Sequence, residues 1–417
     1  MVIETIPKGY KQTEIGIIPD EWEVKRLGEC LLKNPDYGIN AAAVAYNDTL
    51  PTYLRITDIS EDGKYLSSNK VSVNNTLADS YYLEEGDIVF ARTGASVGKT
   101  YLYNKNDGKL VFAGFLIRVK VNPKLLDCKY LIFLTQTKSY LAWVLANSMR
   151  SGQPGLNSNE YQSLQIPVPP TLTEQSAIAR VLSDTDTLIE SLDKLIAKKK
   201  NIKQGAMQQL LTGKKRLPGF KDEWDVKKIG AIAEMYSGGT PSTFVPDYWN
   251  GSIRWMSSGE LNLKKVYDVG GRITELGLKN SSAKLIPPKC VLIGLAGQGK
   301  TRGTVAINYV DLCTNQSIGA IFPNETFVPE YLYYNLNTRY NELRNLSTGE
   351  GGRGGLNLTI IRNILVPLPI KEEQIAIARV LSDMDVELEE LEQKRDKYEQ
   401  LKTGLMQQLL TGKIRLK

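Results

Sequence analysis

The chain has 417 residues, which is too long for one compact core, so we expect two domains. Hydrophobic residues make up 42% and charged residues 24%, no apolar run reaches the roughly 18 residues of a membrane span, and the N-terminus lacks a signal peptide's apolar stretch, which together predict a cytoplasmic protein. The absence of histidine excludes imidazole bases and most transition-metal sites, the four cysteines have no metal-ligand spacing, and the net charge of +6 is compatible with a polyanionic partner without requiring one.

The first half of the sequence begins with a β-rich part, in which polar and apolar residues alternate and β-branched and aromatic residues gather. A helical stretch follows at 127–147, then a glycine-rich loop, SGQPGLN (151–157), and a proline-punctuated connector, IPVPP (166–170). The predicted strands of the β-rich part are 52–59, 86–93 and 110–121.

After this connector the hydrophobic period becomes helical and stays so for about 39 residues, without a proline. A helix of that length would measure roughly 58 Å. Its apolar residues recur at alternating steps of three and four, with polar interruptions, which is the pattern of a coiled-coil seam. The predicted seam positions are Ile178, Val181, Leu188, Leu192, Leu195 and Ile202.

The second half of the sequence repeats this order. A β-rich part is followed by a helical stretch (329–346), a glycine-rich loop, TGEGGRGGLN (348–357), a connector, VPLPI (366–370), and a second long helical run. The predicted strands are 252–258, 290–297 and 303–309. The predicted seam positions of the second helix are Ile377, Val380, Met384, Leu391, Tyr398 and Leu401.

The two long helical runs are nearly the same sequence. EQSAIARVLSDTD (174–186) and EQIAIARVLSDMD (373–385) are identical at 11 of 13 positions, and MQQLLTGK occurs at both 207–214 and 406–413. Neither helix can bury its apolar stripe alone, so we expect the two to pack against each other. The β-rich parts hardly resemble one another. The long helices and the segments that flank them therefore form a duplicated frame, and the β-rich parts that this frame carries differ.

The two ends of the chain complete the repeat. The N-terminal segment PKGYKQTEIGIIPDEW resembles LPGFKDEW, which follows the first long helix. The N-terminal segment therefore reads as the continuation of the C-terminal helix. We expect the termini to lie close together, in a circular, pseudo-two-fold arrangement.

Two short motifs resemble enzyme motifs. GLAGQGKT (294–301) satisfies the P-loop pattern, but RGTVAINYV continues as a strand where a phosphate-binding helix would have to begin. We therefore expect a strand–turn–strand element there, as at GASVGKT (94–100) in the first half. NPDY (34–37) resembles the tetrapeptide of amino-methyltransferases except for Asp36, and an ordinary turn explains it better.

Taken together, the duplicated EQxAIARVLSDxD helix with its MQQLLTGK end, the proline-rich entry to each helix and the DEWxVKxxG start of each half resemble the specificity subunits of type I restriction–modification systems. The stretch SGGTPS…YWNGSIRW (237–255) is also typical of one class of target domain in that family. The resemblance covers essentially the whole length of the chain.

The resemblance implies an α+β fold in which two β-rich target recognition domains are joined by two long antiparallel helices. Each domain would read one half of a bipartite, asymmetric DNA site, and the helices would set the spacing and dock two methyltransferase subunits. Motor-nuclease (restriction) subunits would complete the assembly. The chain itself would be no enzyme and would bind no cofactor, since S-adenosylmethionine, ATP and magnesium would belong to the partner subunits.

The expected division of the chain is a first target recognition domain at 1–165, a first spacer helix at 166–217, a second recognition domain at 218–366 and a second spacer helix at 367–417. Two other functions stay open at this point. One is a nucleotide-binding enzyme built on Gly294–Thr301, and the other is a coiled-coil scaffold whose globular parts bind protein.

The candidate DNA-binding residues are polar or basic and lie on loops beside glycines, because arginine pairs with guanine and asparagine or glutamine with adenine. Asn157 and Asn357 occur in both halves, which favours a capping role for them. The candidates are Arg92, Ser96, Lys99, Arg150, Gln153 and Asn157 in the first half, and Thr240, Ser257, Lys300, Arg302, Arg353 and Asn357 in the second.

Overall fold

The structure is a computed structural model, and it describes residues 6–150, 152–297, 300–346 and 355–417. The chain divides into two compact α+β units. The first unit combines Met1–Asp193 with Lys394–Lys417, and the second is Lys194–Gln393. Each unit therefore holds a β-rich part and a portion of both long helices. Within the described ranges, no helix is long and apolar enough to cross a membrane.

The β-rich part of the first unit is made of short strands in small sheets. In order of hydrogen bonding, one sheet is β10 (Leu110–Phe112), β6 (Thr52–Leu54), β7 (Val71–Val73) and β5 (Ala43–Ala45), and another is β4 (Asp36–Tyr37), β11 (Leu116–Lys120), β8 (Asp87–Ala91) and β9 (Thr100–Leu102). β8 is fully buried and pairs antiparallel with β11 on one side and β9 on the other. The loop that follows β8 therefore starts from a rigid interior strand.

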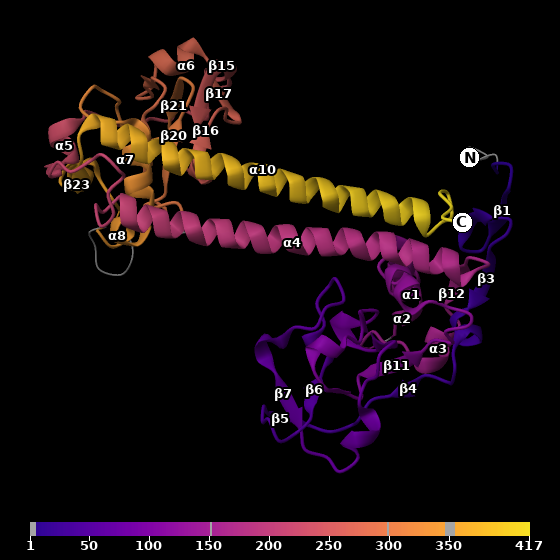
Figure 1. Ribbon diagram of the computed structural model, residues 1–417. Coiled ribbons are helices and arrows are strands. Elements are labelled where there is room, and N and C mark those ends of the chain that lie inside the picture. The colour runs from indigo at the N-terminus through magenta and orange to yellow at the C-terminus, as the bar shows by residue number, and fades with distance from the viewer. Residues whose placement is uncertain (1–5, 151, 298–299, 347–354) are drawn as a thin grey trace. The chain divides into compact units, whose positions relative to one another are not determined.

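Helices connect this β-rich part to the long helix of the first unit (Figure 1). The predicted stretch 127–147 is two helices, α1 (Cys128–Leu134) and α2 (Lys138–Ser148), because the Thr135 and Thr137 hydroxyls bond back to carbonyls of α1 and end it. The shorter elements are α3 (Ser158–Gln162), η1 (Leu27–Cys30), η2 (Ile56–Asp58), η3 (Ser67–Asn69), η4 (Ala78–Tyr81), η5 (Gly94–Ser96) and η6 (Lys105–Asp107).

The N-terminal segment of the first unit begins with a hairpin of β1 (Tyr10–Thr13) and β2 (Gly16–Pro19). β3 (Glu23–Arg26) then pairs antiparallel with β12 (Gln165–Val168), so the proline connector forms a two-stranded sheet. Proline is tolerated in β12 because an edge strand need not donate every main-chain hydrogen bond.

The second unit follows the same order with different strands. One sheet is β14 (Met235–Ser237), β22 (Ile318–Ile321), β19 (Val291–Gly294), β20 (Val305–Asn308) and β16 (Lys265–Val266), and another is β17 (Gly271–Ile273), β15 (Trp249–Met256), β21 (Leu312–Thr314) and β18 (Leu285–Ile286). β13 (Asp225–Lys228) pairs with β23 (Leu365–Leu368), as β3 pairs with β12. The helical elements are α5 (Ile229–Ile232), α6 (Glu275–Lys279), α7 (Pro329–Asn337), α8 (Tyr340–Asn345), α9 (Leu358–Arg362), η7 (Pro246–Tyr248) and η8 (Ser258–Leu263).

The two long helices are α4 (Leu172–Leu210) and α10 (Lys371–Leu409), and each has 39 residues. Inside each unit their portions lie side by side and antiparallel (Figure 1). In the first unit Asp186 pairs with Lys402 and Asp193 approaches Arg395; in the second, Lys199 pairs with Glu387 and Lys203 with Asp385. As residue numbers rise along α4, those of their partners fall along α10.

The buried stripe of the long helices differs in part from the predicted seam. Leu195, Ile202 and Leu401 are 38%, 46% and 48% exposed, so the prediction is wrong at these positions. Ile196 and Leu388 are buried instead, because a step of four, from Leu192 in α4 and from Met384 in α10, keeps the side chain on the inward face. Of the remaining predicted positions, Ile178, Leu192 and Ile377 are buried, and Val181, Leu188, Val380, Met384, Leu391 and Tyr398 are half-buried.

The termini of the described chain lie close together, as predicted. The Tyr10 hydroxyl donates a hydrogen bond of 3.2 Å to the Gly412 carbonyl, and the Lys417 ammonium lies 2.9 Å from the Glu21 carboxylate. The N-terminal hairpin and the end of α10 therefore belong to the same first unit.

Candidate nucleic-acid interface

Arg92 directly follows β8, and its environment is the most specific feature of the first unit. Its carbonyl accepts a hydrogen bond of 2.8 Å from the Leu156 amide, which ties the glycine-rich loop to the strand end. Its guanidinium carbon lies 4.8 Å from the centre of the Tyr37 ring, a cation–π distance. Its Nε is buried and has no hydrogen-bond partner among the described residues.

Tyr37 supplies the aromatic ring on which the Arg92 guanidinium stacks. Its hydroxyl accepts a hydrogen bond of 3.1 Å from the Ser158 amide at the start of α3, which fixes the ring relative to the glycine-rich loop. The exposed edge of Tyr37 makes it a further candidate for the interface, which the sequence did not predict. Tyr37 lies in NPDY, where Asp36 and Tyr37 form β4 instead of the expected turn and Asp36 forms an ion pair with Arg118.

The glycine-rich loop of the first unit runs beside the loop after β8. The Gly94 amide donates to the Pro154 carbonyl at 2.9 Å, and a side chain on Gly94 would meet the Gln153 amide nitrogen at 2.7 Å. Gln153 is exposed. The structure therefore brings the candidates Arg92 and Gln153 onto neighbouring loops.

The other two candidates of this loop have local partners. Arg150 forms an ion pair with Glu160, and Asn157 is the N-cap of α3, where its side-chain oxygen accepts from the Glu160 amide at 3.0 Å. Asn357 caps α9 in the same way, accepting from the Ile360 amide at 2.9 Å. Capping explains why this asparagine occurs in both halves, so neither Asn157 nor Asn357 needs a DNA contact to account for it.

Ser96 and Lys99 lie in the turn between β8 and β9. Ser96 is the last residue of η5 and is half-buried. Lys99 forms an ion pair with Glu61 at 2.7 Å, an acidic side chain that is almost fully exposed. An exposed ion pair of this kind contributes little to stability and can be exchanged for a phosphate contact.

In the second unit, Thr240 and Ser257 are held by neighbours. The Thr240 hydroxyl donates to the Gln316 side-chain oxygen at 2.6 Å on the exposed surface. The Ser257 hydroxyl and amide both bond the Glu260 carboxylate, at 3.0 and 2.8 Å, in a capping box that begins η8. Ser257 is therefore accounted for by local structure, whereas Thr240 stays on an accessible loop.

The P-loop motif region is a strand–turn–strand element, as predicted. β19 and β20 pair antiparallel, as β8 and β9 do, and no helix begins within the described residues 300–304. Lys300 is exposed. Arg302 is only 9% exposed and lies in the interior, so the prediction that Arg302 contacts DNA at the surface is wrong. Arg353 lies outside the described residues.

Main-chain hydrogen bonds identify equivalent positions in the two units. Leu156 donates to the carbonyl of Arg92 and Leu356 donates to that of Leu295, both at 2.8 Å. Gly38 donates to Leu116 and Gly238 to Ile318, and an added Cβ on either glycine would collide with a carbonyl oxygen. Arg92 thus corresponds to Leu295 and Tyr37 to Ser237, so the first unit has an aromatic–guanidinium pair where the second has Ser and Leu.

The second unit presents a different exposed side chain. Phe244 is 95% exposed on a loop that two indole N–H groups fix, since Trp249 donates to the Ser242 carbonyl at 3.1 Å and Trp255 to the Gly239 carbonyl at 2.9 Å. A large apolar side chain held in water on a rigid loop indicates a contact surface. It lies within the predicted SGGTPS…YWNGSIRW stretch, but the sequence alone does not tell an exposed Phe from a core residue.

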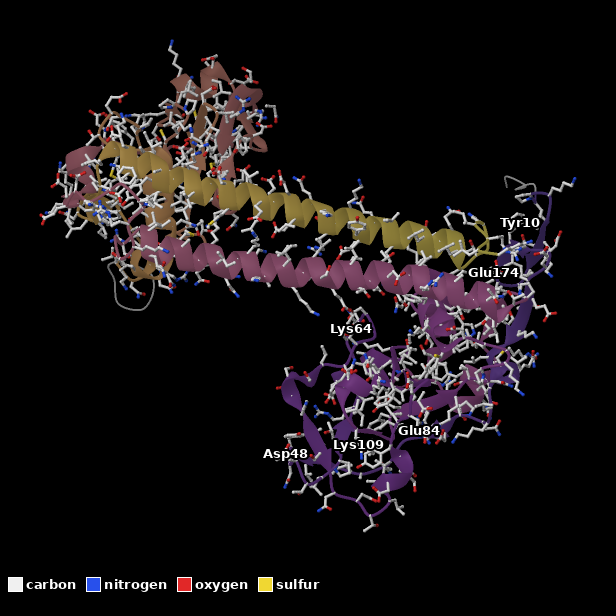
Figure 2. All side chains as sticks on the ribbon, viewed as in Figure 1. Tyr10, Asp48, Lys64, Glu84, Lys109 and Glu174 are labelled. Atoms are coloured by element: carbon white, nitrogen blue, oxygen red, sulfur yellow. The ribbon has the colours of Figure 1, made fainter. Side chains whose placement is uncertain are left out.

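Each long helix has near its start a buried carboxylate that binds the segment following the other long helix. In the first unit Glu174, which Figure 2 labels, accepts from Arg415 at 2.9 Å. In the second, Glu373 accepts from Arg216 at 2.6 Å and from the Trp224 indole at 3.0 Å. Both carboxylates come from the duplicated helix motif, so the repeated sequence encodes a repeated contact.

A second repeated contact joins the two long helices to the rest of each unit. Asp385 binds Lys203, the Tyr334 hydroxyl at 2.6 Å and Lys265 at 3.0 Å. Burial acts to raise the pKa of Asp385, but the hydrogen bonds from Lys203, Tyr334 and Lys265 outweigh it and hold the pKa below its ordinary value. At the equivalent place in the first unit Asp186 binds Lys402 at 2.7 Å.

A third contact connects the β-rich part of the first unit to α4. Figure 2 shows Lys64 beside that helix, where its ammonium lies 2.7 Å from Glu190.

In the part of the chain that the structure describes, no group of three or more acidic or cysteine side chains is placed to hold a metal ion.

Two units that share a frame and differ in their exposed loops define a class of duplicated recognition proteins. A family model for the type I restriction modification DNA specificity domain matches residues 19–201 and again 221–402. The chain belongs to this family. It is a specificity subunit of a type I restriction–modification system with two target recognition domains, a DNA-recognition component rather than a catalytic one.

Individual relatives agree with this assignment. The chain is 26% identical over 428 residues to the MjaVIII specificity subunit of Methanocaldococcus jannaschii, covering 96% of this chain and 94% of that protein. It is 28% identical over 240 residues to the EcoR124I/EcoR124II specificity subunit of Escherichia coli, covering 54% and 57%. The predicted function is confirmed, and the P-loop alternative gains no support.

A solved structure has a similar fold. The S subunit of a type I restriction–modification system from M. genitalium matches with a TM-score of 0.62 and 15% identity, over 93% of this chain and 96% of that one. A second structure, from work on the assembly and conformational transition of a type I system, matches with a TM-score of 0.55 and 18% identity, over 95% and 99%.

Proposed function

We propose that each unit reads one half of a bipartite, asymmetric DNA site. The observation that carries this proposal is the repetition of the frame contacts, Glu174–Arg415 and Glu373–Arg216, around β-rich parts whose exposed residues differ. A repeated frame presents its two β-rich parts in the same way, and unlike side chains on them would select unlike half-sites.

The long helices would act as a coiled-coil spacer with a pseudo-two-fold, circular arrangement. The equivalent ion pairs Asp186–Lys402 and Lys203–Asp385 support this reading, because each joins the same two positions of the duplicated helix. The Tyr10–Gly412 hydrogen bond supports the circular part, since it connects the N-terminal segment to the end of α10. The corresponding division of the chain is 1–165 and 218–366 for the recognition domains, with 166–217 and 367–417 for the spacers.

The partners would be double-stranded DNA, two methyltransferase subunits docked on the helices and restriction subunits that complete the complex, all in the cytoplasm. Exposed apolar residues on both long helices support a docking role, since a partner subunit could cover them. These residues are Leu195, Ile202, Ile375, Val386 and Leu401.

DNA would meet the accessible candidates of each unit. In the first unit these are the half-buried Arg92, Ser96 and Lys99 and the exposed Arg150 and Gln153. In the second they are Thr240 and Lys300, to which the structure adds Phe244, while Arg353 is retained from the sequence alone. Basic side chains would hold phosphates, and arginine or glutamine would contact base edges.

The spacer role is tested by lengthening both helices together. We would insert seven residues after Asp193 in α4 and seven after Gln393 in α10, because a full heptad keeps the buried stripe in register. The insertion adds about 10 Å, near three base-pair steps. Mapping methylated adenines in cells that also make the partner subunits should show the same two half-sites with a gap wider by about three base pairs.

A matched control is a seven-residue insertion in the exposed turn after Asp48, which should leave the gap unchanged. An unaltered gap in the double-helix insertion variant, with methylation retained, would contradict the spacer role.

A further inference from the structure

The Arg92 side chain is half-buried and yet has neither a carboxylate partner nor a side-chain hydrogen bond within the described residues. The guanidinium lies against the Tyr37 ring, and its Nε is shielded from water without an acceptor. Burying a charged donor without a hydrogen bond costs free energy, and proteins normally avoid the arrangement. The buried Nε is closed to solvent, so an outside acceptor can reach only the two terminal guanidinium nitrogens, which make no hydrogen bond within the described residues.

The other arginines of the same β-rich part are neutralised. Between residues 30 and 165 the arginines are Arg55, Arg92, Arg118 and Arg150. Arg55 pairs with Asp58, Arg118 with Asp36 and Arg150 with Glu160. Arg92 is thus the arginine of this part that lacks a carboxylate in the described structure.

The carboxylate that could serve Arg92 is already engaged. Glu160 lies on α3, whose first amide donates to Tyr37. It receives Arg150 and the Asn157 amide, the latter at 2.8 Å. The neighbouring loop adds the exposed amide side chain of Gln153 and no charge. The surroundings therefore hold the guanidinium in place without satisfying it.

At the equivalent described position, the second unit has no arginine stacked on an aromatic ring. Leu295 replaces Arg92 and is buried, Ser237 replaces Tyr37 and Leu358 replaces Ser158. The main-chain bond that marks this position is nevertheless the same, at 2.8 Å from Leu156 or Leu356. The position belongs to the shared frame, and only the side chains that it presents differ.

We propose that Arg92, held in place by stacking on Tyr37, binds the N7 and O6 edge of a guanine in the half-site read by the first unit. The inference rests on the proposed function and assigns one contact within it. A planar guanidinium with parallel N–H donors fits two adjacent acceptors on one base, and guanine presents such a pair in the major groove. Stacking leaves that donor edge available and fixes its direction before DNA binds.

The test uses the full chain assembled with its modification subunits and a labelled duplex that contains the mapped target. Each guanine of the first half-site is replaced in turn by 7-deazaguanine, which lacks the N7 acceptor. With the natural chain, one of these replacements should weaken binding by about 5- to 150-fold. The Arg92→Leu variant, which carries the residue of the second unit, should bind the unmodified target more weakly and lose its sensitivity to that one replacement.

Two further variants make the outcome specific. Arg92→Lys keeps the charge and N–H donors but loses the planar group that stacks on Tyr37, so it should keep only part of the sensitivity to that replacement. Arg26→Leu, at an exposed position of β3, should behave like the natural chain. Discrimination at the second half-site should persist in all variants, which shows that they are folded.

Three results would overturn the assignment. They are an Arg92→Leu variant that remains sensitive to the same replacement, a uniform loss of affinity on all sequences (the mark of a phosphate contact), and a first half-site without a G·C pair. Failure of the natural complex to prefer its target over random duplex would instead reject the proposed function itself.

Discussion

The two units differ at one equivalent contact between the long helices, where an aspartate of one helix binds a lysine of the other. In the second unit Asp385 gathers Lys203, Lys265 and the Tyr334 hydroxyl, whereas in the first unit Asp186 pairs with Lys402. The ring beside that lysine is Tyr334 in one case and Phe133 in the other, at 5.6 and 5.7 Å. The frame is therefore defined by the helix–helix ion pair, and each unit adds its own attachment of the β-rich part.

The attachment to the long helix also differs between the units. Lys265, on β16, reaches the same carboxylate that joins the two helices, while Lys64 reaches a separate one, Glu190. Lys64 and Glu190 are more exposed than Lys265 and Asp385. The duplicated sequence therefore conserves the contacts between the long helices more strictly than the contacts that hold each β-rich part against them.

The largest expected effect is loss of a buried anchor carboxylate. Glu373→Ala removes a fully buried carboxylate and leaves the half-buried Arg216 and Trp224 side chains without their acceptor, so it should cost about 2–3 kcal/mol of local stability. Hydrogen exchange of residues 211–230 would measure it. Glu174→Ala should weaken the first unit and leave 211–230 unchanged. Equal effects of both variants on both units would contradict a separate anchor in each.

The second prediction concerns the unequal aspartates. Asp385→Asn removes the charge that three side chains share and should cost about 2 kcal/mol, whereas Asp186→Asn should cost about 1 kcal/mol or less because it loses one partly exposed pair. Hydrogen exchange of α10 near 385 and of α4 near 186 would compare them. Similar losses would show that Lys265 and Tyr334 contribute nothing to the attachment.

A pH titration sharpens the same contrast. Because the pKa of Asp385 is held low in the folded chain, its contribution is fully present above the unfolded pKa and is lost as pH falls through the folded one. The difference in urea midpoint between the natural chain and Asp385→Asn should therefore persist at pH 6 and shrink below about pH 4. A difference that grew on acidification would contradict the sign.

The smallest effect on stability is expected at Phe244. Because this side chain is 95% exposed, Phe244→Ala should change the free energy of unfolding by less than about 0.5 kcal/mol. Loss of an apolar contact to DNA should weaken binding of the target by about 1 kcal/mol, with the first half-site read as before. Unaltered affinity in a fluorescence titration would remove Phe244 from the interface.

The long helices and the proximity of the termini were predicted well, because the helical period of apolar residues and the sequence repeat are strongest there. The two runs of about 39 residues became α4 and α10, and the proximity of the termini followed from the repeated segments that flank them. The errors at Leu195, Ile202 and Leu401 arose because the predicted alternation of three and four reached each of these positions by a step of three, which placed it outside the buried stripe.

The β-rich parts were harder to predict, since tertiary contacts there override local pattern. The stretch 110–121 became two strands separated by a turn at Gly114, and β12 and β23 formed despite their prolines because each has a single partner strand. Burial separated Arg302 from Arg92, and no feature of the sequence predicted that Arg302 would lie in the interior while Arg92 would stay half-buried. The stacking of Arg92 on Tyr37 joins residues 55 positions apart and could not be read from spacing.

One repeated frame carries two interchangeable recognition domains. A chain in which the first domain replaces the second tests this most directly. Residues 229–364 would be replaced by residues 27–164, because Leu27 bonds to Leu164 and Ile229 to Ile364 through equivalent main-chain hydrogen bonds of 2.8 and 3.0 Å. Mapping methylated adenines in cells that make this chain with its partners should reveal an inverted repeat of the first half-site with the natural gap. A target that stays asymmetric, or a direct repeat of the first half-site, would contradict the account.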